Sequence, residues 1–503
     1  MLGKKKFEPK LMYSINLEEL IPRDNFYRKI NELLDMRFIY RRCKDLYGKT
    51  GKPSVDPVVF IKLNLYGYFE NIISDRELIR KASDSLSVRY FLGFDIDEEL
   101  PWHSTISRTR ALMPEELYEE LFSEVLGKCI DAGLVSGEHQ SIDSTLVKAN
   151  ASLETLEKKK PELKLQEYIR KSIENNKEEI LTDDQLKNHA DTRDQQDKKD
   201  NVKTETEIKI VKNLVGDKKK KRSNRYYISK TDPDSRIARK PGKKTDLYYT
   251  THYSVDSKTK VITDVLTTHS DIGDSDTMMK VVDRASKRLG EKGLKIKSVS
   301  ADKNYCSGEN LRDLEQREII PYIPTQKHPN TTGGIPKEEF KYDKAKDIYV
   351  CPNNKILIYR YTTKRKARTY SCSSEDCKDC SLRIFCTSGK KVRKVQHSIY
   401  QDEYERLEKR LKTSAGKRAM FLRKTGPEPI FGEAKLYHGM RKFMTKGINK
   451  AQKNSLMIAT VQNLKRLIKN LNKKKNRTEL NAKPYNYLLK IFRINLEYSD
   501  SFI

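Results

Sequence analysis

Three short segments of the chain each carry an acidic residue at one end of an apolar run. They are HQSIDSTLVKA, LKIKSVSADKNY and GPEPIFGEAK, and their acids are Asp143, Asp302 and Glu428. An acid at the C-terminal end of a strand lies at the rim of a sheet, where it can reach a metal ion and a substrate. Many strands end in Asp because Asp favours turns, so one such residue is weak evidence for a metal site. The sequence around each acid must therefore be considered.

From Gln140 onward, β-rich runs alternate with helical patterns. The runs LYYTTHYSV and KVITDVLTTHS, joined at Asp256 to Thr259, predict a hairpin, and SDTMMKVVDRASKRLG predicts an amphipathic helix that ends at Gly290. LKIKSVSA then predicts a strand, NLRDLEQRE a short helix and IIPYIP a short strand. This order predicts an α/β fold with a mixed sheet and crossover helices, which is the ribonuclease H-like order.

In that order the first strand, the fourth strand and a late helix converge on one edge of the sheet. Three acids that meet there can hold two divalent cations, Mg²⁺ or Mn²⁺, an arrangement that enzymes use to break phosphodiester bonds. Other acids nearby have simpler explanations. Glu433 is expected at the surface or behind the metal ligands, and Asp271, Asp274 and Asp276 are expected to cap a helix.

Residues 1–135 are predicted to form a helical domain. Ser74 and Glu77 form a capping-box pattern, Ser104 or Thr105 is expected to cap a later helix, and Pro114 begins another. We expect this domain to bind DNA, and a role in dimerisation or packing is the alternative. The expectation depends on scattered basic side chains, namely Lys62, Arg76, Arg80, Arg89, Arg108 and Arg110.

The net charge favours a polyanion as partner. The chain has 101 Lys and Arg against 71 Asp and Glu, a formal charge of +30 over 503 residues. Each phosphate that a basic side chain neutralises releases condensed counterions, so this surplus favours nucleic acid, although a highly charged soluble surface is the alternative. We expect a cytoplasmic protein without a membrane span, because the chain opens without an apolar signal region and has no stretch of roughly 18 apolar residues.

A charged stretch separates Asp143 from the predicted hairpin. Residues 152–240 are crowded with charged and amide side chains until Tyr226, and they include the run KKKKR at 218–222. We expect an insertion that is partly mobile, with a charged helical hairpin in its first half. The basic run fits a solvated linker and a contact to a DNA backbone equally well.

Five of the eight cysteines lie between positions 351 and 386. Cys377 and Cys380 form a C-x-x-C knuckle, which supplies two thiolates from one turn. We expect Cys351, Cys377, Cys380 and Cys386 to bind a structural Zn²⁺ ion, with Cys372 as the spare. Simple burial of the cysteines is the alternative, and disulfides are disfavoured in the cytoplasm.

These segments resemble a bacterial insertion-sequence transposase of the DDE class, in the group with a tyrosine, arginine, glutamate and lysine signature. SIDST resembles the first catalytic strand, SADKNYCSGEN the second, and CKDCSLRIFC the cysteine-bearing insert. The most specific block is EPIFGEAKLYHGMRKFMTKGINKAQKNSLMIATVQNLKRL. The chain departs from the family at Phe421 in place of the signature tyrosine, at Lys424 in place of the arginine, and at Asn304, where members often have glycine.

The resemblance implies an enzyme that binds terminal inverted repeats, cleaves DNA there and joins the ends to a target. It makes Asp143, Asp302 and Glu428 the catalytic metal ligands and Lys435 the signature lysine. Double-stranded DNA and further copies of the chain are the implied partners. A nuclease without strand transfer and an inactive DNA-binding remnant are the alternatives. The expected parts are a helical DNA-binding domain (1–135), a first catalytic strand (136–151), the insertion (152–240), a ribonuclease H-like core (241–325), a cysteine-bearing insert (326–400), completion of the core (401–475) and a tail (476–503).

Overall fold

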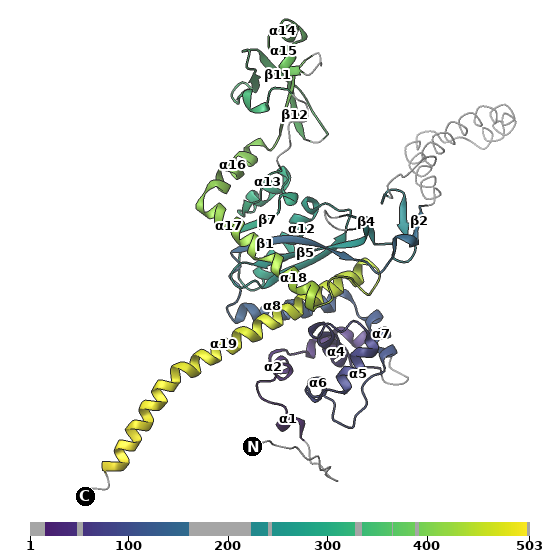
Figure 1. The fold of residues 1–503 in the computed structure, drawn as a ribbon, viewed down its shortest axis with the longest axis vertical. Helices are drawn as coiled ribbons and strands as arrows, with labels where there is room; N and C mark the ends of the chain where they lie inside the picture. Colours follow the sequence, from purple (N-terminus) through teal and green to yellow (C-terminus); the bar gives the residue numbers. More distant parts are fainter. Residues whose placement is uncertain are drawn as a thin grey trace, which may run out of the picture.

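The computed structural model describes residues 16–47, 54–159, 223–239, 244–326, 334–364, 366–387 and 392–499, with side chains up to residue 474. Figure 1 shows a helical N-terminal region, a sheet flanked by helices, and a smaller sheet that stands apart beyond α16. The long helix α19 (Ile448–Ser499) runs along the first two parts. Most of the charged insertion, including the KKKKR run, lies outside the described residues.

The N-terminal region is helical, as predicted. Ser74 accepts a hydrogen bond from the Glu77 N–H at 3.5 Å and so caps α5, as the capping-box pattern indicates. The prediction for α7 was wrong: the helix begins at His103 after the extended residue Trp102, so Ser104 and Thr105 already lie inside it. The helices are α1 (Leu17–Leu20), α2 (Phe26–Leu33), α3 (Arg37–Cys43), α4 (Pro57–Phe69), α5 (Asp75–Ser83), α6 (Leu86–Leu92), α7 (His103–Leu112) and α8 (Glu115–Asp131).

Most of the basic side chains singled out in this region bind within the region itself. Arg110 pairs with Asp75 through bonds of 2.6 and 2.8 Å, and Lys62 donates to a backbone carbonyl at 2.8 Å. Arg80 and Arg89 are likewise hydrogen-bonded to nearby groups. Four of the six candidate DNA contacts therefore support the local fold, and the two that are exposed without such a bond among the described residues are Arg76 and Arg108.

The central sheet has the predicted order of elements and is a mixed sheet. Strand β5 pairs antiparallel with β1 and β6, whereas β7 pairs parallel with β1 and β8. Parallel neighbours need a crossover, and the helices α12 (Asp274–Gly290) and α13 (Gly308–Gln316) occupy those connections. The strands are β1 (His139–Lys148), β4 (Arg236–Ala238), β5 (Asp246–Asp256), β6 (Ile262–His269), β7 (Ser298–Ala301) and β8 (Ile320–Tyr322).

A two-stranded ribbon marks the base of the insertion. Strand β2 (Leu156–Lys158) pairs antiparallel with β3 (Tyr227–Ser229), and the residues between them include the stretch that is not described. The ribbon therefore brings the two ends of the insertion together, close to the point where β1 ends and β4 begins.

Helix α19 covers the outer edge of β6. Asn463 accepts a hydrogen bond from the Ile262 N–H at 2.9 Å and donates one to the Ile262 carbonyl at 2.8 Å. Gln452 accepts from the Thr267 N–H at 2.7 Å and donates to the Val265 carbonyl at 2.9 Å. An amide side chain offers a donor and an acceptor, as a backbone peptide does, so these two side chains take the place of a neighbouring strand.

The cysteine-bearing insert folds as a separate antiparallel sheet with its own small core, in which Tyr349, Leu357 and Tyr370 are buried. Helices α16 (Gln401–Lys412) and α17 (Ser414–Thr425) lead back toward the central sheet, where α18 (Pro427–Tyr437) precedes α19. The elements of the insert are β9 (Lys341–Asp343), β10 (Ile348–Val350), β11 (Ile356–Thr362), β12 (Ala367–Ser371), α14 (Ser374–Lys378), α15 (Arg383–Thr387) and β13 (Lys394–Ser398).

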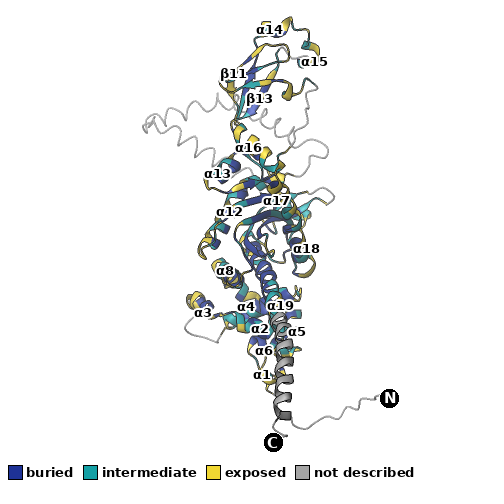
Figure 2. Ribbon diagram, turned by 90° about the vertical axis from the view of Figure 1, so that its left-hand side faces the viewer, coloured by how far each residue is buried: buried dark blue, intermediate teal, exposed yellow. Residues whose placement is uncertain are grey.

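Burial follows this division of the chain. Figure 2 shows buried residues concentrated in the central sheet and along the part of α19 that lies against it. Helix α19 continues without a break past residue 476, where the tail was expected to begin. None of the helices in the described ranges combines the length and the apolar character needed to cross a membrane.

Replacing Asn463 with leucine should destabilise the whole protein. The substitution leaves the buried N–H and carbonyl of Ile262 without partners, and each unsatisfied buried group costs about 1–3 kcal/mol. We expect the free energy of unfolding, measured by chemical denaturation, to fall by about 2–6 kcal/mol. Thr460→Ala is the control, because Thr460 donates to a carbonyl of its own helix. Equal losses for the two variants would contradict the role assigned to Asn463.

Candidate active site

The parallel pairing of β1 with β7 places Asp143 beside Asp302. The ladder ends at the pair Ile142 and Ala301, so the next residue on each strand is an acid. Asp302 is still extended, with φ −72° and ψ 160°, and neighbouring strands lie about 4.8 Å apart. The prediction that Asp143 ends its strand was wrong. Strand β1 continues to Lys148 through its pairing with β5. Asp143 instead lies where the parallel half of the ladder stops.

The start of helix α18, which carries Glu428, packs against β1. Gly426 approaches β1 so closely that a β-carbon added to it would lie 3.6 Å from Ser141 Cβ. Ser141 is two residues before Asp143 on the strand, and Glu428 is two residues after Gly426. Glu428 is exposed in the first turn of α18. Helix α18 is held by α19, because Gln462 donates to the Ile430 carbonyl at 2.9 Å.

Two basic side chains, one from α17 and one from α18, contact Asp302 and strand β1. Arg423 Nη1 lies 3.5 Å from Asp302 Oδ1, and the Arg423 side chain is 14% exposed. Lys435, the expected signature lysine, donates to Thr145 Oγ1 on β1. Phe421 and Lys424, where the signature has tyrosine and arginine, are both exposed. Arg423, one position earlier than Lys424, is therefore the guanidinium that reaches the acids, and the signature spacing alone did not identify it.

A polar network, with His252 and Tyr305 buried and Ser144 and Asp274 partly buried, lies on the other face of β1 from Asp143. Ser144 donates to Asp274 Oδ1 at 3.0 Å, and His252 Nδ1 lies 3.8 Å from the same oxygen. Tyr305 Oη lies 2.7 Å from His252 Nδ1. Burial lowers the pKa of His252 to about 3, so its imidazole is neutral.

The electrostatics of Tyr305 link this network to the acids. Burial raises the pKa of its hydroxyl well above the usual range, and the charges of Asp274, Asp143 and Asp302 raise the pKa further. A hydrogen bond with Ser144 acts in the opposite direction and lowers it. The Tyr305 hydroxyl thus stays protonated in the presence of three carboxylates from three different elements.

The acids around the start of α12 do not cap it, contrary to expectation: Asp271 precedes the helix, and Asp274 and Asp276 lie in its first turn. The N-cap residue is Gly273, which has no side chain to accept a bond. Asp274 turns toward Ser144 instead, Asp271 Oδ2 lies 3.4 Å from Arg236 Nε, and Asp276 is exposed. The contact of Asp274 with Ser144 was not predicted, since the two residues are 130 positions apart. The position of Asp274, in the first turn of the helix that follows the predicted hairpin, was the one signal in the sequence that could have suggested this contact.

Glu433 is held away from the other acids. It accepts from Arg466 Nη2 at 2.7 Å, and His438 Nε2 lies 3.6 Å from its Oε1. Burial would raise the pKa of this carboxyl, but His438 and Arg466 outweigh burial and lower it to about 2. Glu433 is therefore an ionised structural group between α18 and α19.

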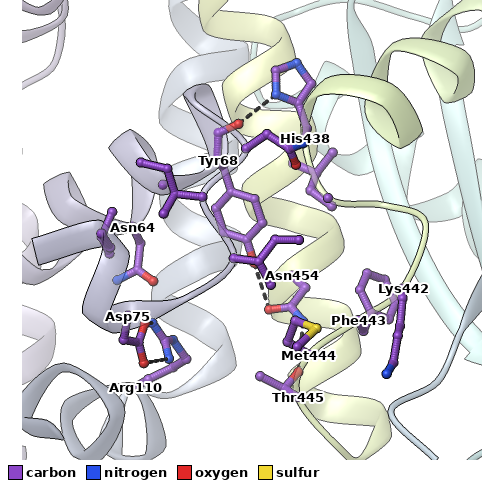
Figure 3. Close-up of a pocket in the computed structure, with 17 residues that line it drawn as sticks. Asn64, Tyr68, Asp75, Arg110, His438, Lys442, Phe443, Met444, Thr445 and Asn454 are labelled. Carbon is purple, nitrogen blue, oxygen red and sulfur yellow. Dashed lines mark hydrogen bonds and ion pairs between the residues drawn. The ribbon is translucent and has the colours of Figure 1, made fainter. Parts of the chain in front are cut away.

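A cavity of about 90 Å³ lies at the joint between the N-terminal region and the segment that leads from α18 into α19. Figure 3 shows the residues that line it. His438 Nδ1 donates to the Tyr68 carbonyl at 2.7 Å, and Tyr68 donates to Asn454 Oδ1 at 2.9 Å. The cavity's one carboxylate, Asp75, is paired with Arg110. The cavity therefore belongs to the contact that fixes α4 against α19, not to the acidic site.

The cysteines of the insert line one small cavity between β12, α14 and α15. All five of them contribute to its wall: Cys351, Cys372, Cys377, Cys380 and Cys386. Burial raises the pKa of the Cys386 thiol, and the neighbouring cysteines 377, 351 and 380 raise it further. The charge of Arg393 acts in the opposite direction and lowers this pKa. The Lys355 N–H donates to Cys351 Sγ at 3.2 Å, a bond that suits a thiolate.

Neither set of residues is closed around an ion. Among the described residues, no group of three or more His, Cys, Asp or Glu side chains has the arrangement of a formed metal site. The donors nevertheless fit the expected ions, because carboxylate oxygens suit Mg²⁺ and Mn²⁺, whereas a knuckle of cysteines suits Zn²⁺. Both sites would have to tighten when an ion binds.

Comparison with known families identifies two parts of the chain. Residues 15–112 match a family described as Transposase domain (DUF772), and residues 350–468 match a family described as Transposase DDE domain. Together the two matches support a transposase of the insertion-sequence DDE class. The second match includes Glu428 and Lys435, whereas Asp143 and Asp302 lie between the matched parts. No curated protein matches the sequence.

Removing the charge of Asp274 should weaken cation binding at the acids. Asp274→Asn keeps an acceptor for Ser144 but loses a negative charge that acts on the same hydroxyl as Asp143 and Asp302. We expect Mn²⁺ affinity, followed by electron paramagnetic resonance, to fall about fivefold, or about 1 kcal/mol. The exposed neighbour Asp276 supplies the matched control as Asp276→Asn. If both variants bind Mn²⁺ equally, Asp274 has no part in the site.

Proposed function

We propose that the protein is a DNA transposase that binds the terminal inverted repeats of an insertion sequence, cleaves DNA there and transfers the freed ends to a target. The observation that carries the proposal is the register of β1 and β7, which ends in Asp143 on one strand and Asp302 on the other. On one side of β1 lies β5, antiparallel to β1, with β6 antiparallel to β5 beyond it. On the other side lie β7 and β8, both parallel to β1, and this strand order supports a ribonuclease H-like core.

Asp143, Asp302 and Glu428 would hold two Mg²⁺ or Mn²⁺ ions. When bound, such ions activate a water or a DNA 3′-hydroxyl and stabilise the oxygen that leaves the scissile phosphate. Around them, Arg423 would balance the charge of Asp302, and Lys435 would hold α18 against β1 through Thr145. The arrangement requires no nucleophile from the protein.

Duplex DNA fits the surplus of basic residues. The formal charge of +30 favours a partner with many phosphates, and DNA affinity should therefore fall steeply with salt. We assign sequence recognition to the helical N-terminal region, because compact helices can place side chains in a major groove. Its exposed Arg76 and Arg108 are the first candidates for these contacts.

Each of Asp143→Asn, Asp302→Asn and Glu428→Gln should reduce cleavage of an end fragment at least a thousandfold while leaving binding of that fragment largely unchanged. Each change removes one metal-binding charge at nearly constant volume, whereas DNA affinity comes from basic residues elsewhere. The assay uses purified protein, Mg²⁺ and a labelled fragment with the DNA ends that flank this reading frame. Cleavage without joining would identify a nuclease, and binding without cleavage by the unmodified protein would identify an inactive remnant.

The control for these variants is Glu408→Gln on α16, where the side chain is exposed. Glu433→Gln is a poorer control, because it breaks the ion pair with Arg466 and should also lower stability. An acid variant that cleaves as fast as Glu408→Gln is wrongly assigned.

We also propose that Cys351, Cys377, Cys380 and Cys386 bind one structural Zn²⁺ ion. Protein purified without chelators should then contain about one equivalent of zinc by elemental analysis. Cys377→Ser should lose the ion and destabilise the insert, whereas Cys372→Ser should keep it. Zinc-free protein, or equal zinc loss in both variants, would count against this set of ligands.

A further inference from the structure

The middle strand of the insert's sheet is unusually exposed. Strand β11 has two neighbours on each side, in the order β13-β12-β11-β10-β9, yet six of its seven residues are exposed. Leu357 alone points into the insert's core. Ile356, Ile358 and Tyr361 are 52%, 45% and 47% exposed. A strand in the middle of a sheet normally has both faces covered or one polar face, so this apolar face needs a partner.

The pairing registers define which side chains share this face. Ile358 lies between Ile348 on β10 and Ser371 on β12, and Ser371 lies next to Lys394 on β13. Tyr361 pairs with Thr369, which pairs with Gln396, and Ile356 pairs with Val350, which pairs with Lys341. Arg360 reaches the same face, since its Nε donates to Ser371 Oγ at 3.2 Å. We call this surface the β11 face.

The β11 face joins flat apolar area to positive charge. Isoleucines 348, 356 and 358 and the ring of Tyr361 form its centre, and Lys341, Arg360 and Lys394 lie around them. Lys394 Nζ lies 5.9 Å from the centre of the Tyr361 ring. The insert as a whole is basic, with sixteen Lys and Arg against seven Asp and Glu between residues 334 and 398. This charge excludes a basic partner and favours a polyanion.

We propose that the β11 face binds unpaired DNA. Bases stack on an exposed aromatic ring and on flat apolar surface, while the phosphates between them need cations close by. A DNA duplex would present only phosphates and groove edges, which leave the isoleucines uncovered. The proposal takes DNA as the partner, in line with the proposed function, and adds that the insert holds a single strand that the acids of the central sheet do not contact.

The test measures binding of a fluorescein-labelled 30-nucleotide single strand to the full chain by anisotropy. The experiment contains neither Mg²⁺, so that cleavage plays no part, nor a chelator, so that cysteine-bound metal is kept. Tyr361→Ala and Ile358→Asp should each weaken binding about fivefold or more, which is the size of one lost base-stacking contact. Both variants should bind the duplex end fragment within twofold of the unmodified protein.

Tyr226→Ala is the matched control, because Tyr226 is 48% exposed and also lies next to a basic side chain, Arg225, but belongs to the insertion. If Tyr361→Ala and Tyr226→Ala bind the single strand equally well, the proposal is wrong. An equal loss for single strand and duplex would also overturn it, because the face would then be a general phosphate contact.

Two further measurements do not depend on that comparison. Photo-crosslinking of a bromodeoxyuridine single strand to the unmodified protein should label a peptide that contains residues 356–361, and labelling confined to other peptides would refute the assignment. Sedimentation equilibrium without DNA tests the competing occupant, a second copy of the chain. If Ile358→Asp shifts the protein from oligomer to monomer, the β11 face is an interface between copies and not a DNA site.

Discussion

The bonds between two amide side chains of α19 and the backbone of β6 fix the arrangement of the site. Asn463 and Gln452 satisfy N–H and carbonyl groups along an edge that no described strand covers. The residue before Asn463, Gln462, binds the carbonyl of Ile430 in α18. One turn of α19 therefore holds both the sheet that carries Asp143 and the helix that carries Glu428. A single helix is thus bonded to both supports, the sheet at Ile262 and Thr267 and the helix α18 at Ile430.

The two faces of β1 contact different elements and carry different charges. Alternation along the strand sends Asp143 and Thr145 toward α17 and α18, and Ser144 toward α12 and Tyr305. The first face is open and bears the basic side chains Arg423 and Lys435. The second is closed, and its neutral His252 and protonated Tyr305 add no charge of their own. The charge on this second face is the carboxylate of Asp274, so the acids of the first face are not neutralised from behind.

Much of the fold follows from local patterns in the sequence. The alternation of β-rich and amphipathic runs predicts the hairpin of β5 and β6, the helix α12 and the strand before Asp302 in their correct order. The limits of a ladder are not local, however, so the continuation of β1 beyond Asp143 could not be predicted. The same holds for contacts across long separations, such as Ser144 with Asp274 or Arg423 with Asp302. Capping statistics favoured Ser104 and Asp274 as helix caps. Helix α7 instead begins one residue before Ser104, and Asp274 accepts a bond from Ser144.

The dependence of β6 on α19 has a consequence for how the protein is made. The backbone N–H groups of Ile262 and Thr267 are hydrogen-bonded by Asn463 and Gln452, which follow them in the chain by 201 and 185 residues. At a synthesis rate of about 5–20 residues per second, those side chains emerge roughly 10–40 s after the strand itself. During that time the ribosome-bound sheet has an open edge that can pair with other chains. Completion of the last helix, and not of the last strand, is therefore the step that ends the risk of aggregation.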